Sequence, residues 1–209
     1  MRPGLIVLHH TAMASWDAAR DRLCDPAAEV SAHYLISEGG EVLALVAEDK
    51  RAWHAGAGTW GGLDDVNSRS IGIELANDGA QPFAAAQMRA LEGLLADVMA
   101  RWAIPAHGVI AHSDMAPGRK GDPGARFDWR RLAQGGLSVW PDKVNAGHLG
   151  DFSTNTRRFG YPAIGAGLVL AAFRLRFRPW ARGPLDGTDA GIIADLADRF
   201  GVDDGGKLA

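Results

Sequence analysis

Apolar side chains recur at two different spacings along the first 140 residues. Residues 5–8 form a short apolar run, which predicts a buried strand over residues 5–9, and residues 70–75 alternate large apolar with small or polar side chains, as a half-buried strand does. Residues 83–102 instead repeat apolar side chains at helical spacing, which predicts the longest helix of the chain, ended by Pro105. Alternation along residues 70–75 also predicts that Glu74 lies on the opposite side of its strand from the isoleucines.

Shorter elements fill the spaces between these three. The pattern predicts a helix over residues 16–24, a hairpin over residues 32–46 that turns at Gly39 and Gly40, a strand over residues 108–112 and a short helix over residues 129–132. Strands that alternate with helices indicate an α/β fold, which we expect to be a mixed central β-sheet flanked by helices.

A different pattern follows this region. Residues 135–150 are rich in Gly, Pro and Asn, and beyond them the patterns are helical, over residues 164–177 and 190–200. We therefore predict a boundary near residue 140, with the α/β domain over residues 1–140 and a small all-α domain over residues 141–209. A chain that ends near Pro141 should then fold by itself.

Composition narrows the functions open to the chain. It has 209 residues, 47% of them hydrophobic, a net charge of −3 and a sequence pI near 6.1, so no excess of positive charge indicates nucleic acid as a partner. Cys24 is the single cysteine, which excludes an intrachain disulfide and leaves histidines and carboxylates as metal ligands. The apolar run before His9 is too short for a secretory signal, and no stretch approaches a membrane span, so we predict an unexported, cytoplasmic chain.

Two histidines stand at the ends of predicted strands. His9 and His112 each follow a short apolar run, and two histidines with one carboxylate form the ligand set of a catalytic zinc, which keeps its fourth position for water. His10 competes with His9, although adjacent strand residues face opposite sides and one of the two must point away. For the carboxylate, both Asp114 and Asp122 follow His112, and we favour Asp122 because its loop can fold back.

Short blocks containing histidines, glycines and aromatic residues stand in a recognisable order over residues 4–135. They are residues 5–11 (Leu-Ile-Val-Leu-His-His-Thr), 30–36 (Val-Ser-Ala-His-Tyr-Leu-Ile), 52–56 (Ala-Trp-His-Ala-Gly), 70–77 (Ser-Ile-Gly-Ile-Glu-Leu-Ala-Asn) and 112–124, which begins His-Ser-Asp and ends Asp-Pro-Gly. In this order they resemble the type 2 N-acetylmuramoyl-L-alanine amidases, zinc enzymes that share a fold with peptidoglycan-recognition proteins. Residues 172–179 and 183–188 more loosely resemble the small helical peptidoglycan-binding domain appended to some of these amidases.

The resemblance implies a role for several polar residues. It places the zinc ligands at His9, His112 and Asp122, the general base for the attacking water at Glu74, and an oxyanion-stabilising cation at Lys120. The residue types suit these roles, because a Zn²⁺ held by two neutral imidazoles and one carboxylate stays positive, activates water and polarises an amide carbonyl.

Aromatic residues supply the substrate wall in this interpretation. Trp53 and His54 belong to the block that lines the groove for sugar and stem peptide in the family that the chain resembles, and Trp60 fits the groove or the core equally well. Tyr34 is a weaker candidate near the metal, while the adjacent His33 should point the other way.

The implied reaction is hydrolysis of the amide that joins N-acetylmuramic acid to L-alanine, in peptidoglycan or in muropeptides such as the 1,6-anhydro forms. Two alternatives stay open: a non-catalytic peptidoglycan-recognition protein, and a zinc peptidase of the stem peptide. The retained ligand positions argue against the first, and the absence of a His-Glu-x-x-His motif argues against the second. A cytoplasmic chain suits the recycling of fragments, a wall-binding domain suits the intact polymer, and a role in phage lysis would suit both.

Overall fold

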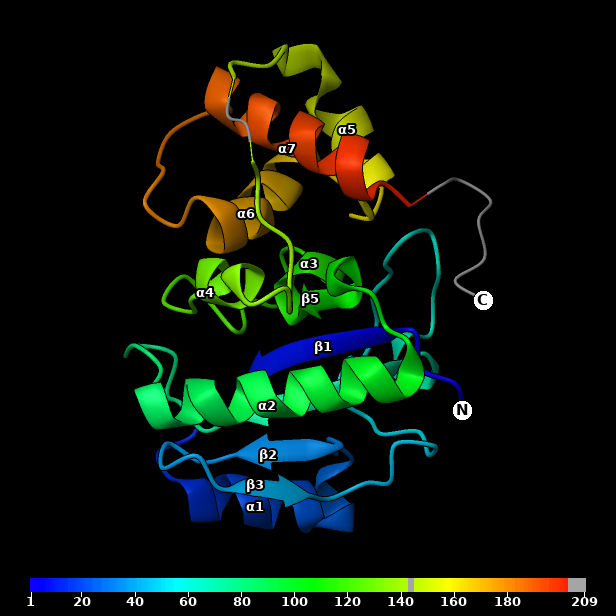
Figure 1. Ribbon diagram of the computed structural model, residues 1–209, viewed down its shortest axis with the longest axis vertical. Coiled ribbons are helices and arrows are strands. Elements are labelled where there is room, and N and C mark those ends of the chain that lie inside the picture. Colours follow the sequence, from blue (N-terminus) through cyan, green and yellow to red (C-terminus); the bar gives the residue numbers. More distant parts are fainter. Residues whose placement is uncertain (143–144, 203–209) are drawn as a thin grey trace.

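A mixed β-sheet forms the centre of the computed structural model, which describes residues 1–142 and 145–202 (Figure 1). Within these residues the strands are β1 (Leu5–His10), β2 (Tyr34–Ile36), β3 (Val42–Ala44), β4 (Ser70–Leu75) and β5 (Val109–Ala111), in the spatial order β3-β2-β4-β1-β5. Strand β1 pairs in parallel with β4 and β5, β4 pairs in parallel with β2, and β3 is the antiparallel edge. The predicted mixed α/β fold is confirmed.

Helices flank this sheet and follow it in the sequence. They are α1 (Trp16–Cys24), α2 (Ala85–Trp102), α3 (His112–Met115), α4 (Trp129–Gln134), α5 (Phe152–Phe159), α6 (Ala166–Phe177) and α7 (Gly187–Phe200), with short 3-10 turns at Pro26–Ala28, Val66–Ser68, Ala106–Gly108 and Leu149–Asp151. Helix α5 was not predicted, because polar residues separate its two buried phenylalanines. Among the helices in the described part of the chain, none has the length and apolar character needed to cross a membrane.

Helix α2 packs against one face of the sheet (Figure 1). Ile71, Ile73 and Leu75 of β4 lie in a buried cluster with Leu91 and Leu95 of α2. This arrangement follows from the alternation of residues 70–75, which sends every second side chain to the same face. Gly72 and Glu74 are thereby left for the other face of the sheet.

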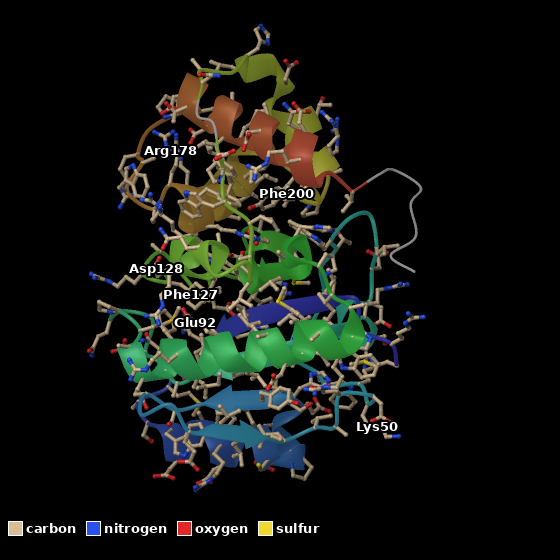
Figure 2. All side chains as sticks on the ribbon, viewed as in Figure 1. Lys50, Glu92, Phe127, Asp128, Arg178 and Phe200 are labelled. Atoms are coloured by element: carbon tan, nitrogen blue, oxygen red, sulfur yellow. The ribbon has the colours of Figure 1, made fainter. Side chains whose placement is uncertain are left out.

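The loop between α3 and α4 is anchored at its far end to α2. Figure 2 shows Phe127 and Asp128 at the start of α4, beside the part of α2 that carries Glu92. The Phe127 ring packs edge-on against Phe83, with a centroid distance of 5.1 Å. Arg131 pairs with Glu92 at 2.5 Å, and the Asp128 carboxylate accepts the Arg131 backbone N–H at 3.0 Å. This anchorage restricts the loop that brings Asp122 back towards the sheet.

The C-terminal helices α5, α6 and α7 lie beyond the β5 edge of the sheet, next to α3 and α4 (Figure 1). They share a buried hydrophobic cluster with the sheet, in which Val7 and Ile110 meet Phe152, Phe173 and Ile193. The predicted division near residue 140 stays a prediction about folding units. The packing itself is continuous across it.

Candidate metal centre and active site

The carboxyl ends of three neighbouring strands bring the candidate catalytic residues together. His9 lies near the end of β1 and pairs in register with Glu74 of β4, and α3 begins at His112 directly after β5. Because these strands are parallel, their carboxyl ends meet at one edge of the sheet. The loop after α3 then places Asp122 beside both histidines.

Three ligand atoms form a small triangle at this edge. The Nδ1 atoms of His9 and His112 are 2.9 Å apart, and each lies 3.0 Å from Oδ2 of Asp122. Burial and the nearby His112 lower the pKa of His9 to about 4, so its imidazole is neutral.

The donor set fits a small cation at the centre of this triangle. The His112 Nε2–H donates to the carbonyl oxygen of Ala55 at 2.9 Å, which leaves the lone pair of His112 Nδ1 facing Asp122. Lone pairs and a carboxylate that converge without a proton between them repel each other unless a cation lies among them. Tetrahedral zinc with bonds of about 2.0–2.1 Å places neighbouring ligand atoms roughly 3.3 Å apart, close to the spacings seen here.

The structure separates the two rival ligands from this triangle. His10 lines the same cleft but stays outside the triangle, and its Nδ1 accepts the backbone N–H of Ala12 at 3.1 Å. Asp114 is fully buried, and its carboxylate is taken up by Arg176 at 2.5 Å and by the Tyr161 hydroxyl at 2.7 Å. Both residues therefore have other roles, and His9 and Asp122 are the ones that meet His112.

Glu74 faces the same cleft as the triangle. Its Oε2 atom is buried and has no hydrogen-bond partner within the described residues. Burial, reinforced by the negative charge of Asp122, raises the pKa of Glu74 to about 8, and the positive charge of Lys120 opposes this rise. An unpartnered carboxylate with a raised pKa beside a cation site is suited to take up and release a proton.

A cleft of about 310 Å³ opens over these residues. It is lined by the triangle, Glu74 and Lys120, and by Trp53, whose side chain is 51% exposed at the rim. The lining also includes Arg22 and Leu23 of α1 and, in an adjoining cleft, Arg119. Sequence reasoning missed these three, and only the position of Arg119 next to Lys120 could have indicated it.

Tyr34 does not reach the cleft, which corrects the expectation that it binds substrate. The register pairs Tyr34 with Ile73, whose side chain lies on the α2 face, and paired residues share a face. The Tyr34 hydroxyl donates to Glu48 at 2.6 Å on that face. His33 points instead to the site face, where its ring lies 5.8 Å from the ring of His54, so the expected orientations of these two neighbours are reversed.

Trp60 belongs to the core and not to a substrate wall. Its side chain is 2% exposed and packs edge-on against Phe159 and Tyr161, with centroid distances of 5.7 and 5.3 Å. Gly160 has φ of +130°, and a Cβ there would come within 2.6 Å of the Trp60 ring. The indole is thus packed closely by the end of α5 and the turn that follows it. Of the two functions weighed for Trp60, the structure supports the core.

Comparison with known proteins agrees with this geometry. The family described as N-acetylmuramoyl-L-alanine amidase (Amidase_2) matches residues 1–125. The chain is 36% identical over 234 aligned positions to the N-acetylmuramoyl-L-alanine amidase AmiD of Escherichia coli K12, with 95% of this chain and 84% of that protein covered. It is 37% identical to the 1,6-anhydro-N-acetylmuramyl-L-alanine amidase AmpD of Enterobacter cloacae, over 63% of this chain and 79% of the relative.

Solved structures extend the likeness to the C-terminal helices. A complex of AmiD from E. coli with the substrate anhydro-N-acetylmuramic acid-L-Ala-D-gamma-Glu-L-Lys superposes with a TM-score of 0.89 at 33% identity, covering 97% of this chain and 91% of that one. AmpDh3 from Pseudomonas aeruginosa in complex with anhydromuramic pentapeptide gives a TM-score of 0.87 at 31% identity, covering 96% and 93%. The chain belongs to the N-acetylmuramoyl-L-alanine amidase family. It is a hydrolase of the amide between N-acetylmuramic acid and L-alanine, as the sequence predicts.

Proposed function

We propose that this amidase works with a single Zn²⁺ held by His9, His112 and Asp122. The observation that carries the proposal is the triangle of ligand atoms, 2.9–3.0 Å on each side, at the floor of the cleft. Two imidazoles and one carboxylate are a typical catalytic zinc set, and they would leave a fourth position on the metal for water.

The residues around the triangle supply the proton transfers. When bound, zinc lowers the pKa of water and polarises the carbonyl of the scissile amide. Glu74 accepts the proton that the attacking water loses and returns it to the nitrogen of L-alanine as the C–N bond breaks. The Lys120 ammonium stabilises the negative charge that develops on the carbonyl oxygen. The products are the free carboxyl of the sugar's lactyl group and the free amine of the peptide.

The substrate we propose is a muropeptide fragment that carries 1,6-anhydro-N-acetylmuramic acid. Solved relatives that cover nearly the whole chain hold anhydromuramic peptides. The exposed indole of Trp53 at the rim of the cleft offers a flat apolar surface to a sugar ring. The cytoplasmic location, which suits the recycling of such fragments, stays a prediction that cell fractionation would test.

Metal content tests the proposed centre directly. The purified chain should hold one zinc, lose activity when treated with a chelator and regain it when zinc is added back. His112→Ala and Asp122→Ala should lose the metal, whereas His10→Ala, which changes the neighbouring histidine outside the triangle, should keep it. A fully metallated His112→Ala protein would contradict the assignment.

A further inference from the structure

Residues 54–55 contact both histidines of the metal triangle, on the Nε2 side of each ring, which faces away from Asp122. His112 Nε2 lies 2.9 Å from the carbonyl oxygen of Ala55, and His9 Nε2 lies 3.0 Å from Nδ1 of the adjacent His54. A histidine binds a metal through one ring nitrogen only if the proton sits on the other, so the partner of the far nitrogen decides whether the near one is available.

For His112, the carbonyl oxygen of Ala55 by itself determines the tautomer. A carbonyl oxygen only accepts hydrogen bonds, so Nε2 of His112 must carry the proton and Nδ1 must be bare. For His9 the partner is a second imidazole, which either donates or accepts. The tautomer of His9 therefore depends on what holds the proton of His54.

A chain of hydrogen bonds behind His54 fixes that proton. The Ser70 hydroxyl lies 2.6 Å from the carbonyl oxygen of Val66 and must donate to it, because the carbonyl has no proton to give. The Ser70 oxygen is then an acceptor for His54 Nε2–H at 3.3 Å. With its proton on Nε2, His54 presents a bare Nδ1, which accepts the proton of His9 Nε2. His9 Nδ1 is left bare and faces Asp122.

The surroundings are shaped to keep His54 in this place. Gly72 lies beneath its ring, where a Cβ would come within 2.3 Å of the imidazole, so no larger residue fits. The side-chain oxygen of buried Asn67 accepts the backbone N–H groups of both His54 and Ala55, at 3.0 and 2.8 Å.

We propose that His54, held by Ser70, is a positioning residue that sets the tautomer of the zinc ligand His9. This role is distinct from the substrate-wall function expected for His54, which also lines the cleft, and it rests on the proposed metal centre. Its consequence is measurable as zinc affinity, because a His9 with the proton on Nδ1 must lose or move that proton before it can bind metal. Loss of such a supporting hydrogen bond typically weakens metal binding about 10–100-fold.

Variants of His54 separate the hydrogen bond from the bulk of the ring. His54→Asn keeps an acceptor oxygen at the position of Nδ1 and should bind zinc within a few-fold of the parent chain. His54→Leu removes the acceptor and should weaken zinc binding about 10–100-fold in competition with a chelating dye. Trp53→Leu changes the exposed neighbour and should leave zinc affinity unchanged. Equal zinc affinities of the Asn and Leu variants and the parent would overturn the proposal.

The tautomers themselves can be observed in the zinc-loaded parent protein labelled with ¹⁵N-histidine. Nuclear magnetic resonance should find the proton of His9 and that of His54 both on Nε2, and Ser70→Ala should alter the His54 ring signals. A His54 that carries its proton on Nδ1 would overturn the proposal even if the Leu variant failed to fold. A parent chain that bound no zinc would instead defeat the metal centre, so the two failures are distinguishable.

Discussion

Replacing Arg176 with Met should destabilise the whole fold, because this buried arginine of α6 neutralises a buried carboxylate next to the active site. The side chains of Arg176 and Asp114 are both 0% exposed, and their charged atoms lie 2.5 Å apart. Arg176 also donates to the carbonyl oxygen of Val109 at 3.1 Å and to the Ser138 hydroxyl at 3.2 Å. Its guanidinium lies 4.3 Å from the ring centre of Trp129.

The size of the effect follows from this geometry. Methionine keeps an unbranched apolar stem against Trp129 but removes the charge, which leaves the Asp114 carboxylate in a dry environment with the Tyr161 hydroxyl and one backbone N–H as partners. Removing one partner of a buried ion pair costs about 3–5 kcal/mol of the free energy of unfolding. A domain is stable by only about 5–15 kcal/mol, so Arg176→Met should be marginally folded.

Urea unfolding at constant zinc concentration, followed by tryptophan fluorescence, measures this cost. Arg199→Met is the matched control, because Arg199 is 39% exposed and pairs with Asp195 within one helix, and it should cost less than about 1 kcal/mol. Adding Asp114→Asn to Arg176→Met removes the unpaired charge but keeps an acceptor for Tyr161, so part of the stability should return. A loss below about 1 kcal/mol for Arg176→Met would refute the reasoning.

Three further predictions concern the site and the domain boundary. Glu74→Gln should keep zinc and bind muropeptide while turnover falls about a hundredfold or more. Unchanged turnover would show that Glu74 has no catalytic role. In the zinc-free protein, burial raises the pKa of Glu74 from its ordinary value of 4.5 to about 8. Between these two pH values the folded state therefore keeps a proton on Glu74 that the unfolded state has released. Stability should therefore fall as pH rises from about 4.5 to about 8, by a few kcal/mol, and urea unfolding of Glu74→Gln should lack this dependence. A chain ending at Pro141 should be insoluble, or loosely packed by circular dichroism and fluorescence, because it loses Arg176 and about half of the shared hydrophobic cluster. The sequence pattern predicts the opposite, and a soluble, active fragment would support an independent domain.

The strand ends and their histidines were predictable because they depend on local patterns. The alternation of residues 70–75 correctly predicts that the isoleucines and Glu74 face opposite sides, since side chains alternate along any strand. The alternation within one strand does not reveal, however, which of its two faces packs against α2 and which faces the cleft. The orientations of His33 and Tyr34 depend on the register of β2 with β4, which joins segments far apart in the sequence.

Residues with distant partners were harder to interpret. Trp60 stands in a glycine-rich segment, but the rings that bury it belong to Phe159 at the end of α5 and to Tyr161 just after it. Arg176 looks like a solvent-exposed charge on an amphipathic helix, because its partner Asp114 precedes it by 62 positions. Buried ion pairs of this kind leave no periodic signal, so the dependence of α3 on α6 appears only in the folded chain.

The mass of the products from a purified anhydromuropeptide tests the central claim most directly. The zinc-loaded chain should release the free anhydro sugar with its lactyl carboxyl and an intact stem peptide that begins with L-alanine. Glu74→Gln with zinc bound should release neither at a comparable rate. A shortened peptide still attached to the sugar, or an unchanged substrate with the fully metallated chain, would contradict the account.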